Sequence, residues 1–220
     1  MAESLPITAS YSGGKDGALA LYRAVRSGHK PVSLLTTFNA REGRSWFHGV
    51  PAELLQRAAE LMDIPLVLVQ TSADDGYARD FEAALARQKE RGARVCVFGD
   101  IDIQDHYAWC DARCKAAGIA SLFPLWNGGR RALVHELVDA GFKAIITIVD
   151  TTRLSERFLG RTLTREIAEE IAQEGADICG ENGEYHTFVY DGPLFREPVP
   201  YTLGETVKRG NYVILPVLPA

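Results

Sequence analysis

The sequence has little of what marks secreted, membrane-bound or nucleic-acid-binding proteins. Its four cysteines are too few to hold a chain of 220 residues together through disulfides. It has no run of about 18 apolar residues, the length that spans a bilayer, and Met1–Pro6 shows no basic stretch followed by an apolar one. The formal net charge is −5, so long-range attraction to nucleic acid is missing. We therefore expect a cytoplasmic protein without a membrane or nucleic-acid partner.

Apolar residues are plentiful and follow two alternating patterns. They make up 46% of the chain, enough for one compact domain with a small appendage. Spacings of three and four residues, as in Ala18, Leu21, Tyr22 and Val25, predict helices. Runs rich in β-branched residues predict buried strands at 7–11, 32–38, 66–69, 95–98 and 144–149. The alternation predicts an α/β fold, a doubly wound parallel sheet of five strands that binds ligands beyond the carboxyl ends of the strands.

The pattern changes after Asp150. Leu163, Ile167 and Ile171 indicate one more helix, and short strands are expected at 187–190, 199–207 and 212–217. Turn signals at 191–193 and 209–211 favour antiparallel pairing of these strands. We predict an α/β domain over residues 1–150 and a small C-terminal α+β subdomain over residues 151–220.

A glycine-rich loop joins the first predicted strand to the first predicted helix: Ser12-Gly13-Gly14-Lys15-Asp16-Gly17. The first backbone N–H groups of a helix lack intrahelical partners and lie at the positive end of its dipole, which favours an anionic phosphate. The glycines let the backbone approach phosphate oxygens, and Ser12 and Lys15 add donors. Asp16 would repel phosphate unless a cation such as magnesium lies between them. The spacing is not that of the Walker loop, and a turn without any ligand is the alternative.

Further polar residues follow the predicted strands at the same edge of the sheet. Thr37 and Phe38 end the second strand, and Gly99 and Asp100 follow the fourth, so we expect all four beside the nucleotide. His48 could contact adenine or ribose, or act as a structural capping group, and the sequence favours neither. Trp126 is expected in the core or in a pocket wall, where it would contact the substrate.

A second polar string stands near the C-terminus: Cys179-Gly180-Glu181-Asn182-Gly183-Glu184-Tyr185-His186-Thr187. It brings two carboxylates and an imidazole close together around a glycine, a set suited to proton transfer. Acidic loops are commonly just solvated, which is the alternative. Gly180 and Gly183 would let the loop arch over the strand ends.

Both strings resemble known motifs. The first resembles the PP-loop of N-type ATP pyrophosphatases, and the second closely resembles the hallmark of the diphthine–ammonia ligase family. His48-Gly49-Val50, Gly99-Asp100-Ile101 and residues 122–126 resemble the same family. The resemblance implies an adenine nucleotide alpha hydrolase-like fold and an ATP-dependent, amide-forming ligase. It places the family's motifs on Ser12 to Asp16, Gly99, Asp100, Glu181, Glu184, Tyr185, His186 and Thr187.

The resemblance also implies a reaction. ATP would adenylate a carboxylate, AMP and pyrophosphate would be released, and ammonia would form the amide; the implied substrate is diphthine on elongation factor 2. Lys15 and magnesium, with Asp16 as its candidate ligand, would stabilise the departing pyrophosphate. Glu181, Glu184 or His186 would accept a proton from ammonium, and Tyr185 and Thr187 would contact the substrate.

Other interpretations stay open at this point. In place of an arginine-containing stretch expected after Gly99-Asp100, the chain has Ile103-Gln104-Asp105-His106-Tyr107, which leaves the protein substrate open. The alternatives are a PP-loop enzyme that acts on a small molecule or tRNA, and an ATP-binding sensor without turnover. A homodimer is also compatible with the sequence.

Overall fold

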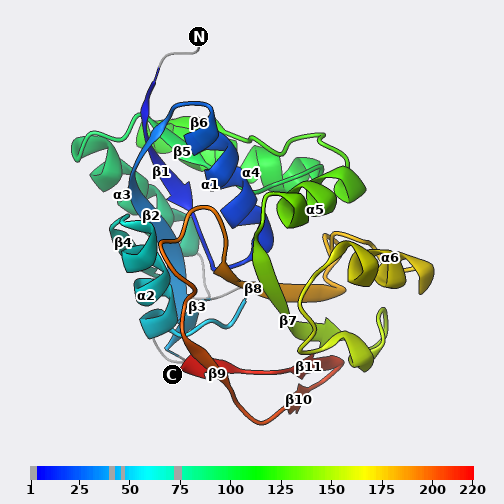
Figure 1. Ribbon diagram of the computed structural model, residues 1–220. Helices are drawn as coiled ribbons and strands as arrows, with labels where there is room; N and C mark the ends of the chain where they lie inside the picture. The colour runs from blue at the N-terminus through cyan, green and yellow to red at the C-terminus, as the bar shows by residue number, and fades with distance from the viewer. Residues whose placement is uncertain (1–3, 40–42, 46–47, 72–75) are drawn as a thin grey trace.

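The main sheet combines five parallel strands with one short antiparallel strand (Figure 1). The computed structural model describes residues 4–39, 43–45, 48–71 and 76–220. The parallel strands lie in the spatial order β4 (Leu66–Gln70), β2 (Lys30–Asn39), β1 (Pro6–Ser10), β5 (Val95–Val97) and β6 (Ala120–Leu122). The short strand β3 (Arg44–Ser45) pairs antiparallel with the end of β2.

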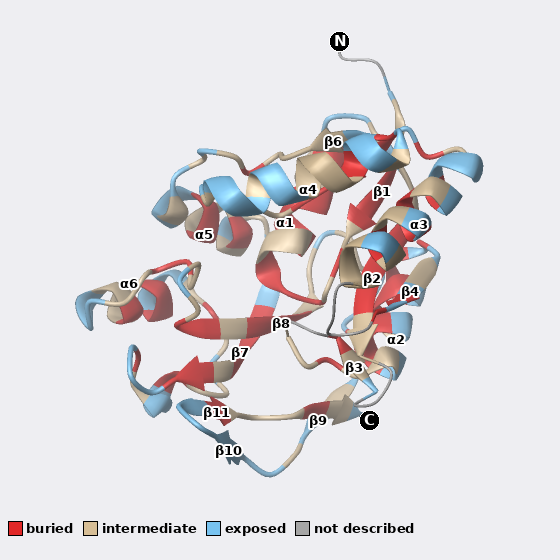
Figure 2. Ribbon diagram, turned by 180° about the vertical axis from the view of Figure 1, so that it is seen from behind, coloured by how far each residue is buried: buried red, intermediate tan, exposed pale blue. Residues whose placement is uncertain are grey.

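Helices cover both faces of this sheet because neighbouring strand residues point to opposite sides. On one face, α1 (Lys15–Arg26), α2 (Ala52–Met62) and α5 (Arg130–Asp139) bury their apolar sides in the larger core. On the other face, α3 (Gly76–Glu90) and α4 (Gln104–Ala117) pack with Leu35 and Cys96. The central strands β1, β2 and β5 are largely buried between the two layers (Figure 2). The predicted doubly wound α/β fold is thereby confirmed.

A second sheet forms the C-terminal half and is antiparallel throughout. Its order is β10 (Val207–Arg209), β11 (Tyr212–Ile214), β7 (Lys143–Asp150) and β8 (Tyr185–Asp191). A separate pair joins β9 (Tyr201–Leu203) to β12 (Val217–Pro219). Between β7 and β8 stand a short 3-10 helix, η1 (Glu156–Phe158), and α6 (Arg165–Gln173). The side chain of Thr164 caps α6 by accepting the N–H of Ile167 at 3.2 Å.

One strand was predicted in the wrong sheet. Residues 144–149 were expected in the parallel sheet, but they form β7, whose neighbours β8 and β11 are antiparallel. A continuous apolar run shows that a strand is buried on both faces and says nothing about the direction of its neighbours. The fifth parallel strand is β6, which is short and half-exposed and so has a weak apolar pattern.

Residues 199–207 and 212–217 were each expected to form one strand, and each contributes to two. Pro216 separates β11 from β12, and its carbonyl accepts the N–H of Gly204 at 2.8 Å. The division into residues 1–150 and 151–220 stays a prediction; the pairing of β7 with C-terminal strands favours a boundary that precedes Lys143.

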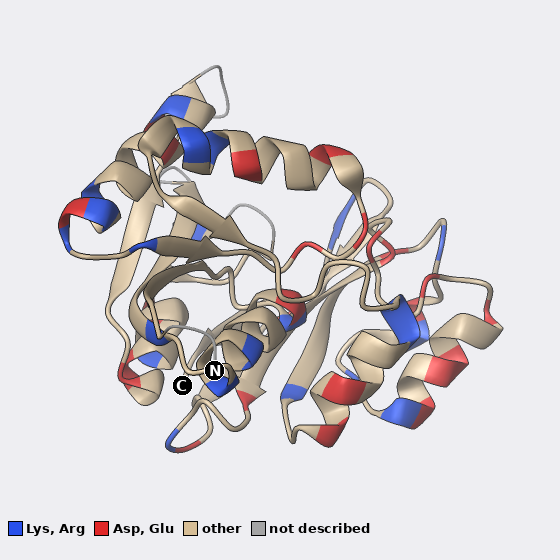
Figure 3. Cartoon of the chain, turned by 90° about the horizontal axis from the view of Figure 1, so that it is seen from above, with Lys and Arg blue, Asp and Glu red and all other residues tan. Residues whose placement is uncertain are grey.

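The two halves meet at the loop after β1. The N–H of Val189 in β8 donates to the carbonyl of Gly13 at 2.8 Å, and the N–H of Lys15 donates to Oγ1 of Thr187 at 3.2 Å. The start of α1 is therefore held from both halves of the chain. Lys, Arg, Asp and Glu are interspersed along the helices drawn in Figure 3.

Candidate active site

A pocket of about 520 Å³ opens at the carboxyl edge of the parallel sheet, where the loop after β1 faces the C-terminal half. Its volume lies in the range of pockets that hold small organic ligands. Most predicted site residues line it: Ser12, Lys15, Asp16, Gly17, Thr37, His48, Gly99, Asp100, Glu181, Tyr185, His186 and Thr187. Segments far apart in the sequence therefore converge on one polar cavity.

The glycine-rich loop has the backbone that its sequence predicts. Gly13 has a φ of +87°, in the left-handed region that favours glycine. Gly14 is the N-cap residue of α1, in an extended conformation, and has no side chain that could accept an N–H of the helix. Gly99, which follows β5, lies against the first turn of α1. The approach is so close that a Cβ added to Gly99 would stand 2.7 Å from the backbone carbonyl carbon of Asp16. The first turn of α1 thus lies at the pocket, where Oγ1 of Thr187 accepts the N–H of Lys15.

Lys15 is a buried cation at the bottom of this site. Its side chain is 7% exposed, and its Nζ donates to both carboxylate oxygens of Asp16, at 3.0 and 2.7 Å. The Nζ also lies 5.6 Å from the ring centre of Tyr185. Burial alone would lower the pKa of Lys15, but the charge of Asp16 raises it well above its ordinary value. Lys15 is therefore a permanent positive charge.

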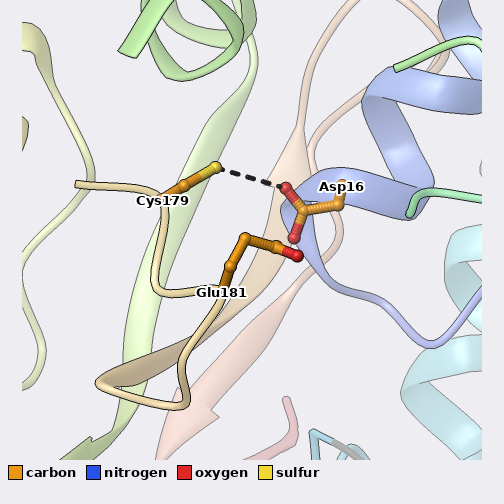
Figure 4. A group of neighbouring side chains, drawn as sticks. All are labelled: Asp16, Cys179 and Glu181. Atoms are coloured by element: carbon orange, nitrogen blue, oxygen red, sulfur yellow. Dashed lines mark hydrogen bonds between the residues drawn. The ribbon is translucent and has the colours of Figure 1, made fainter. Parts of the chain in front are cut away.

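Asp16, Cys179 and Glu181 form a cluster beside Lys15 (Figure 4). Their ligand atoms lie within 4.8 Å of one another, and the thiol of Cys179 stands 4.0 Å from Oδ1 of Asp16. Burial, together with the charge of Asp16, raises the pKa of Glu181 to about 7. Burial also raises the pKa of Cys179, so its thiol stays protonated. Glu181 is the group here that can gain or lose a proton near neutral pH.

Two imidazoles form the opposite part of the polar wall. The rings of His48 and His186 meet edge to face, with centroids 5.1 Å apart. Burial lowers the pKa of His186, and burial and the neighbouring His186 lower that of His48 well below its usual value. His48 lies over the start of α1, since a Cβ added to Gly14 would be 2.5 Å from its ring. Both rings are therefore neutral next to the expected phosphate position.

Glu184 does not face the pocket. Its side chain is buried, and its carboxylate accepts the N–H of Asn182 at 3.1 Å, the side-chain amide of Asn182 at 3.1 Å and the N–H of Asp177 at 3.4 Å. We expected the carboxylates of both Glu181 and Glu184 to face the nucleotide. Of the two, only Glu181 lines the pocket, so the expectation was wrong for Glu184. The carboxylate of Glu184 instead stabilises the loop, because it accepts hydrogen bonds from N–H groups of Asp177 and Asn182.

Some other predicted residues also stand elsewhere. Gly13, Gly14 and Phe38 do not line the pocket. Tyr185 does line it, but its hydroxyl donates to the carbonyl of Ile178 at 2.7 Å. Trp126 packs with Tyr107, their ring centroids 4.6 Å apart, in an aromatic cluster outside the pocket wall.

The apolar half of the pocket was largely missed by sequence reasoning. Tyr77 and Phe81 of α3, Phe98 after β5, and Trp109 of α4 form its wall. Trp109 stands 5.7 Å from the ring centroids of both Tyr77 and Phe81. Tyr77 and Phe81 are four residues apart, on one face of a helix, and that spacing was the available signal. The spacing alone is equally typical of a helix that buries its aromatic side in the core.

Two family models match most of the chain. Residues 6–121 match the Diphthamide synthase N-terminal domain, and residues 130–209 match the Diphthamide synthase C-terminal domain. The chain belongs to the diphthamide synthase family. The family resemblance found in the sequence is thereby confirmed, and with it the prediction of an ATP-dependent, amide-forming ligase.

Relatives of this diphthamide synthase family member carry the name diphthine–ammonia ligase. The Mus musculus protein is 26% identical over 235 residues, which cover 96% of this chain and 88% of the relative. The Homo sapiens protein is 24% identical over 242 residues, with the same two coverages. The Schizosaccharomyces pombe protein is 26% identical over 223 residues, which cover 91% of this chain and 36% of that relative.

A solved structure aligns with most of this chain. It is described as a predicted subunit of tRNA methyltransferase from Methanocaldococcus jannaschii, and it aligns over 89% of this chain and 100% of its own length. The TM-score is 0.48 and the identity is 15%. Among the described residues, no helix combines the length and hydropathy that a bilayer crossing requires.

Proposed function

We propose that this ligase cleaves ATP between its α and β phosphates, adenylates a carboxylate, and then joins ammonia to the acyl group. The observation that carries the proposal is the buried Lys15 in the first turn of α1, which lines a pocket that also contains Glu181. A fixed cation and the positive end of a helix dipole stabilise negative charge on a departing pyrophosphate.

The pocket offers two compartments for ATP. The phosphates fit the polar part, against Lys15 and the first turn of α1, where the helix dipole favours anions. The base fits the apolar part, between Tyr77, Phe81 and Trp109, whose rings offer a stacking surface. With the base and phosphates so placed, the carboxylate substrate would approach from the open side of the pocket.

Magnesium fits the carboxylates of the cluster better than its thiol, because this ion prefers oxygen ligands. Asp16 would hold it together with phosphate oxygens, which leaves the carboxylate of Glu181 free for proton transfer. Bound there, the ion would supply positive charge against the phosphates. Cys179 would not take part, since its thiol keeps its proton.

Ammonia must reach the acyl-adenylate as the neutral amine. A proton acceptor works best when its pKa lies near the working pH, and the pKa of Glu181 is about 7. His186 also lines the pocket, whereas Glu184 does not. We therefore assign proton removal from ammonium to Glu181, with His186 as the neighbouring polar group.

The substrate that we propose is a diphthine-type carboxylate, because the relatives are named for it. Within the segment 103–107, which departs from the pattern expected for the family, His106 lines the pocket and its Nδ1 lies 3.8 Å from Oδ1 of Asp100. This segment is where recognition of the carboxylate substrate would differ from that of the relatives.

The test begins with ATP binding and continues with product analysis. Titration calorimetry with ATP and magnesium should show binding that Lys15→Ala weakens at least tenfold, which corresponds to about 1.4 kcal/mol. Lys30→Ala, which removes an exposed lysine at the far end of β2, is the matched control and should leave binding unchanged. With ammonium and diphthine-bearing elongation factor 2, chromatography should find AMP and pyrophosphate. ADP as the sole product would contradict the mechanism.

A further inference from the structure

We infer that Arg130 is a positioning residue, which fixes the loop that carries Glu181 against the ends of the parallel strands. The inference rests on the proposed function, because it concerns where the proton acceptor stands. Arg130 is the first residue of α5 and lies outside the wall of the pocket.

One side of the Arg130 guanidinium is fixed to the nucleotide-binding half. Its Nε donates to Oδ2 of Asp102 at 2.7 Å, and its Nη2 donates to Oδ1 of the same carboxylate at 2.8 Å. Such a paired contact fixes direction as well as distance. Asp102 follows Asp100 by two residues, in the segment that leads from β5 to α4, so this contact secures Arg130 beside the pocket edge.

The other side of the guanidinium reaches the C-terminal loop. Its Nη1 donates to Oδ2 of Asp177 at 2.6 Å. The same Oδ2 accepts the backbone N–H of Glu181 at 2.8 Å, and Oδ1 accepts the N–H of Cys179 at 3.1 Å. The position of the Glu181 backbone is therefore linked to Arg130 through the carboxylate of Asp177. The same Nη1 also donates to Oδ1 of Asn182 at 3.4 Å.

These contacts require an arginine. A guanidinium is a planar fork with five N–H donors, so it can serve two carboxylates in different directions at once. A lysine would keep the charge but could not hold both carboxylates in the same geometry. Arg130→Lys should therefore retain more of the rate of pyrophosphate release than Arg130→Gln.

The neighbouring arginine supplies a matched control. Arg131 has the same charge and follows directly in α5, but it pairs with Glu169 of α6, which is remote from the loop 177–184. Loss of Arg131 removes one charge from the same helix turn and leaves the contacts of Asp177 intact. Differences between Arg130→Gln and Arg131→Gln thus report the connection to the loop.

The expected effect is on the chemical step more than on ATP binding. A displacement of about 1 Å of a reacting group can slow a reaction roughly a hundredfold. For Arg130→Gln we expect the kcat of ATP-dependent pyrophosphate release to fall between about ten- and a hundredfold, with the KM for ATP changed by less than about threefold. Arg130→Lys should lie between that variant and the wild type, and Arg131→Gln should equal the wild type.

A second measurement does not depend on turnover. Amide hydrogen exchange of peptides that cover residues 177–184 should be about tenfold faster in Arg130→Gln than in the wild type, and unchanged in Arg131→Gln. Asp102→Asn weakens only the contact between Arg130 and residue 102. It should therefore speed the exchange of residues 177–184 less than Arg130→Gln does. The double variant Asp102→Asn, Arg130→Gln should be no worse than Arg130→Gln, because the residues act as one unit.

The outcomes separate this inference from the proposed function. If the wild type releases no pyrophosphate, the proposed reaction fails, and hydrogen exchange still decides whether Arg130 fixes the loop. If Arg130→Gln and Arg131→Gln show the same kcat or the same loop exchange, the positioning role is overturned. An Arg130→Gln protein that binds ATP normally but melts early and keeps full kcat below its melting point would also overturn it.

Discussion

The ionised carboxylate of Glu181 should destabilise the folded protein. Its pKa is raised from 4.5 to about 7 by burial and by Asp16, so the folded state holds this proton more tightly than the unfolded state does. Between these two pKa values the folded protein binds more protons, and its stability falls as the pH rises. Glu181→Gln removes the ionisation and keeps the shape of the side chain. We therefore predict a variant that is more stable than the wild type above pH 7.

The magnitude follows from the pKa difference. A shift from 4.5 to about 7 corresponds to about 3 kcal/mol once the carboxylate is ionised in both states. Glu181 is half-buried and partly screened by solvent, so we expect a gain of about 1–3 kcal/mol at pH 8. For a chain of this length, that gain raises the Tm by roughly 3–10 °C. Below pH 4.5 the carboxyl is neutral in both states and the gain should vanish.

Urea unfolding of the wild type and Glu181→Gln at pH 4, 6 and 8, without ATP, measures this difference directly. The free energy gained by the variant should be absent at pH 4 and greatest at pH 8. Equal stabilities at all three pH values, or a variant that is less stable at pH 8, would refute the electrostatic argument. The same variant should lose about a hundredfold in pyrophosphate release, the scale expected for a positioned base.

The remaining predictions concern two other groups of the site. Glu184→Gln should lower the free energy of unfolding by about 1–3 kcal/mol, because the carboxylate of Glu184 accepts three N–H groups of the loop. Thermal melts of Glu184→Gln and Glu181→Gln test this, and equal melting temperatures of the two variants would contradict it. Gly99→Ala should weaken ATP affinity at least tenfold by calorimetry, since its Cβ would press on the backbone of Asp16 and displace the start of α1; unchanged affinity would show that this close approach is unimportant.

The position of the glycine-rich loop could be predicted because its geometry is local. A strand, two glycines, a lysine and a helix occur within one short stretch, and the structure places Ser12, Lys15, Asp16 and Gly17 in the pocket wall. The doubly wound sheet was predictable for the same reason, since strand and helix patterns alternate along the chain. The misplaced strand β7 marks the limit, because pairing direction depends on distant segments.

The two carboxylates of the C-terminal string could not be told apart from the sequence. Glu181 and Glu184 both stand beside glycines, but Asn182 and Asp177 supply the N–H groups that turn Glu184 inward. Arg130 and Arg131 pose the same problem, as adjacent arginines after two glycines. Only their partners distinguish them: Arg130 pairs with Asp102 and Asp177, and Arg131 pairs with Glu169. All three partners come from other parts of the chain.

The contact between β8 and the loop after β1 bears on how the protein is made. Thr187 accepts the N–H of Lys15 across 172 positions of sequence, and Val189 donates to Gly13 in the same place. A nascent chain that has emerged only as far as β6 has its glycine-rich loop but lacks both of these contacts. Contacts so distant in sequence form late in folding. We expect nucleotide binding to appear only after β8 has left the ribosome, so that an incomplete chain does not yet bind ATP tightly.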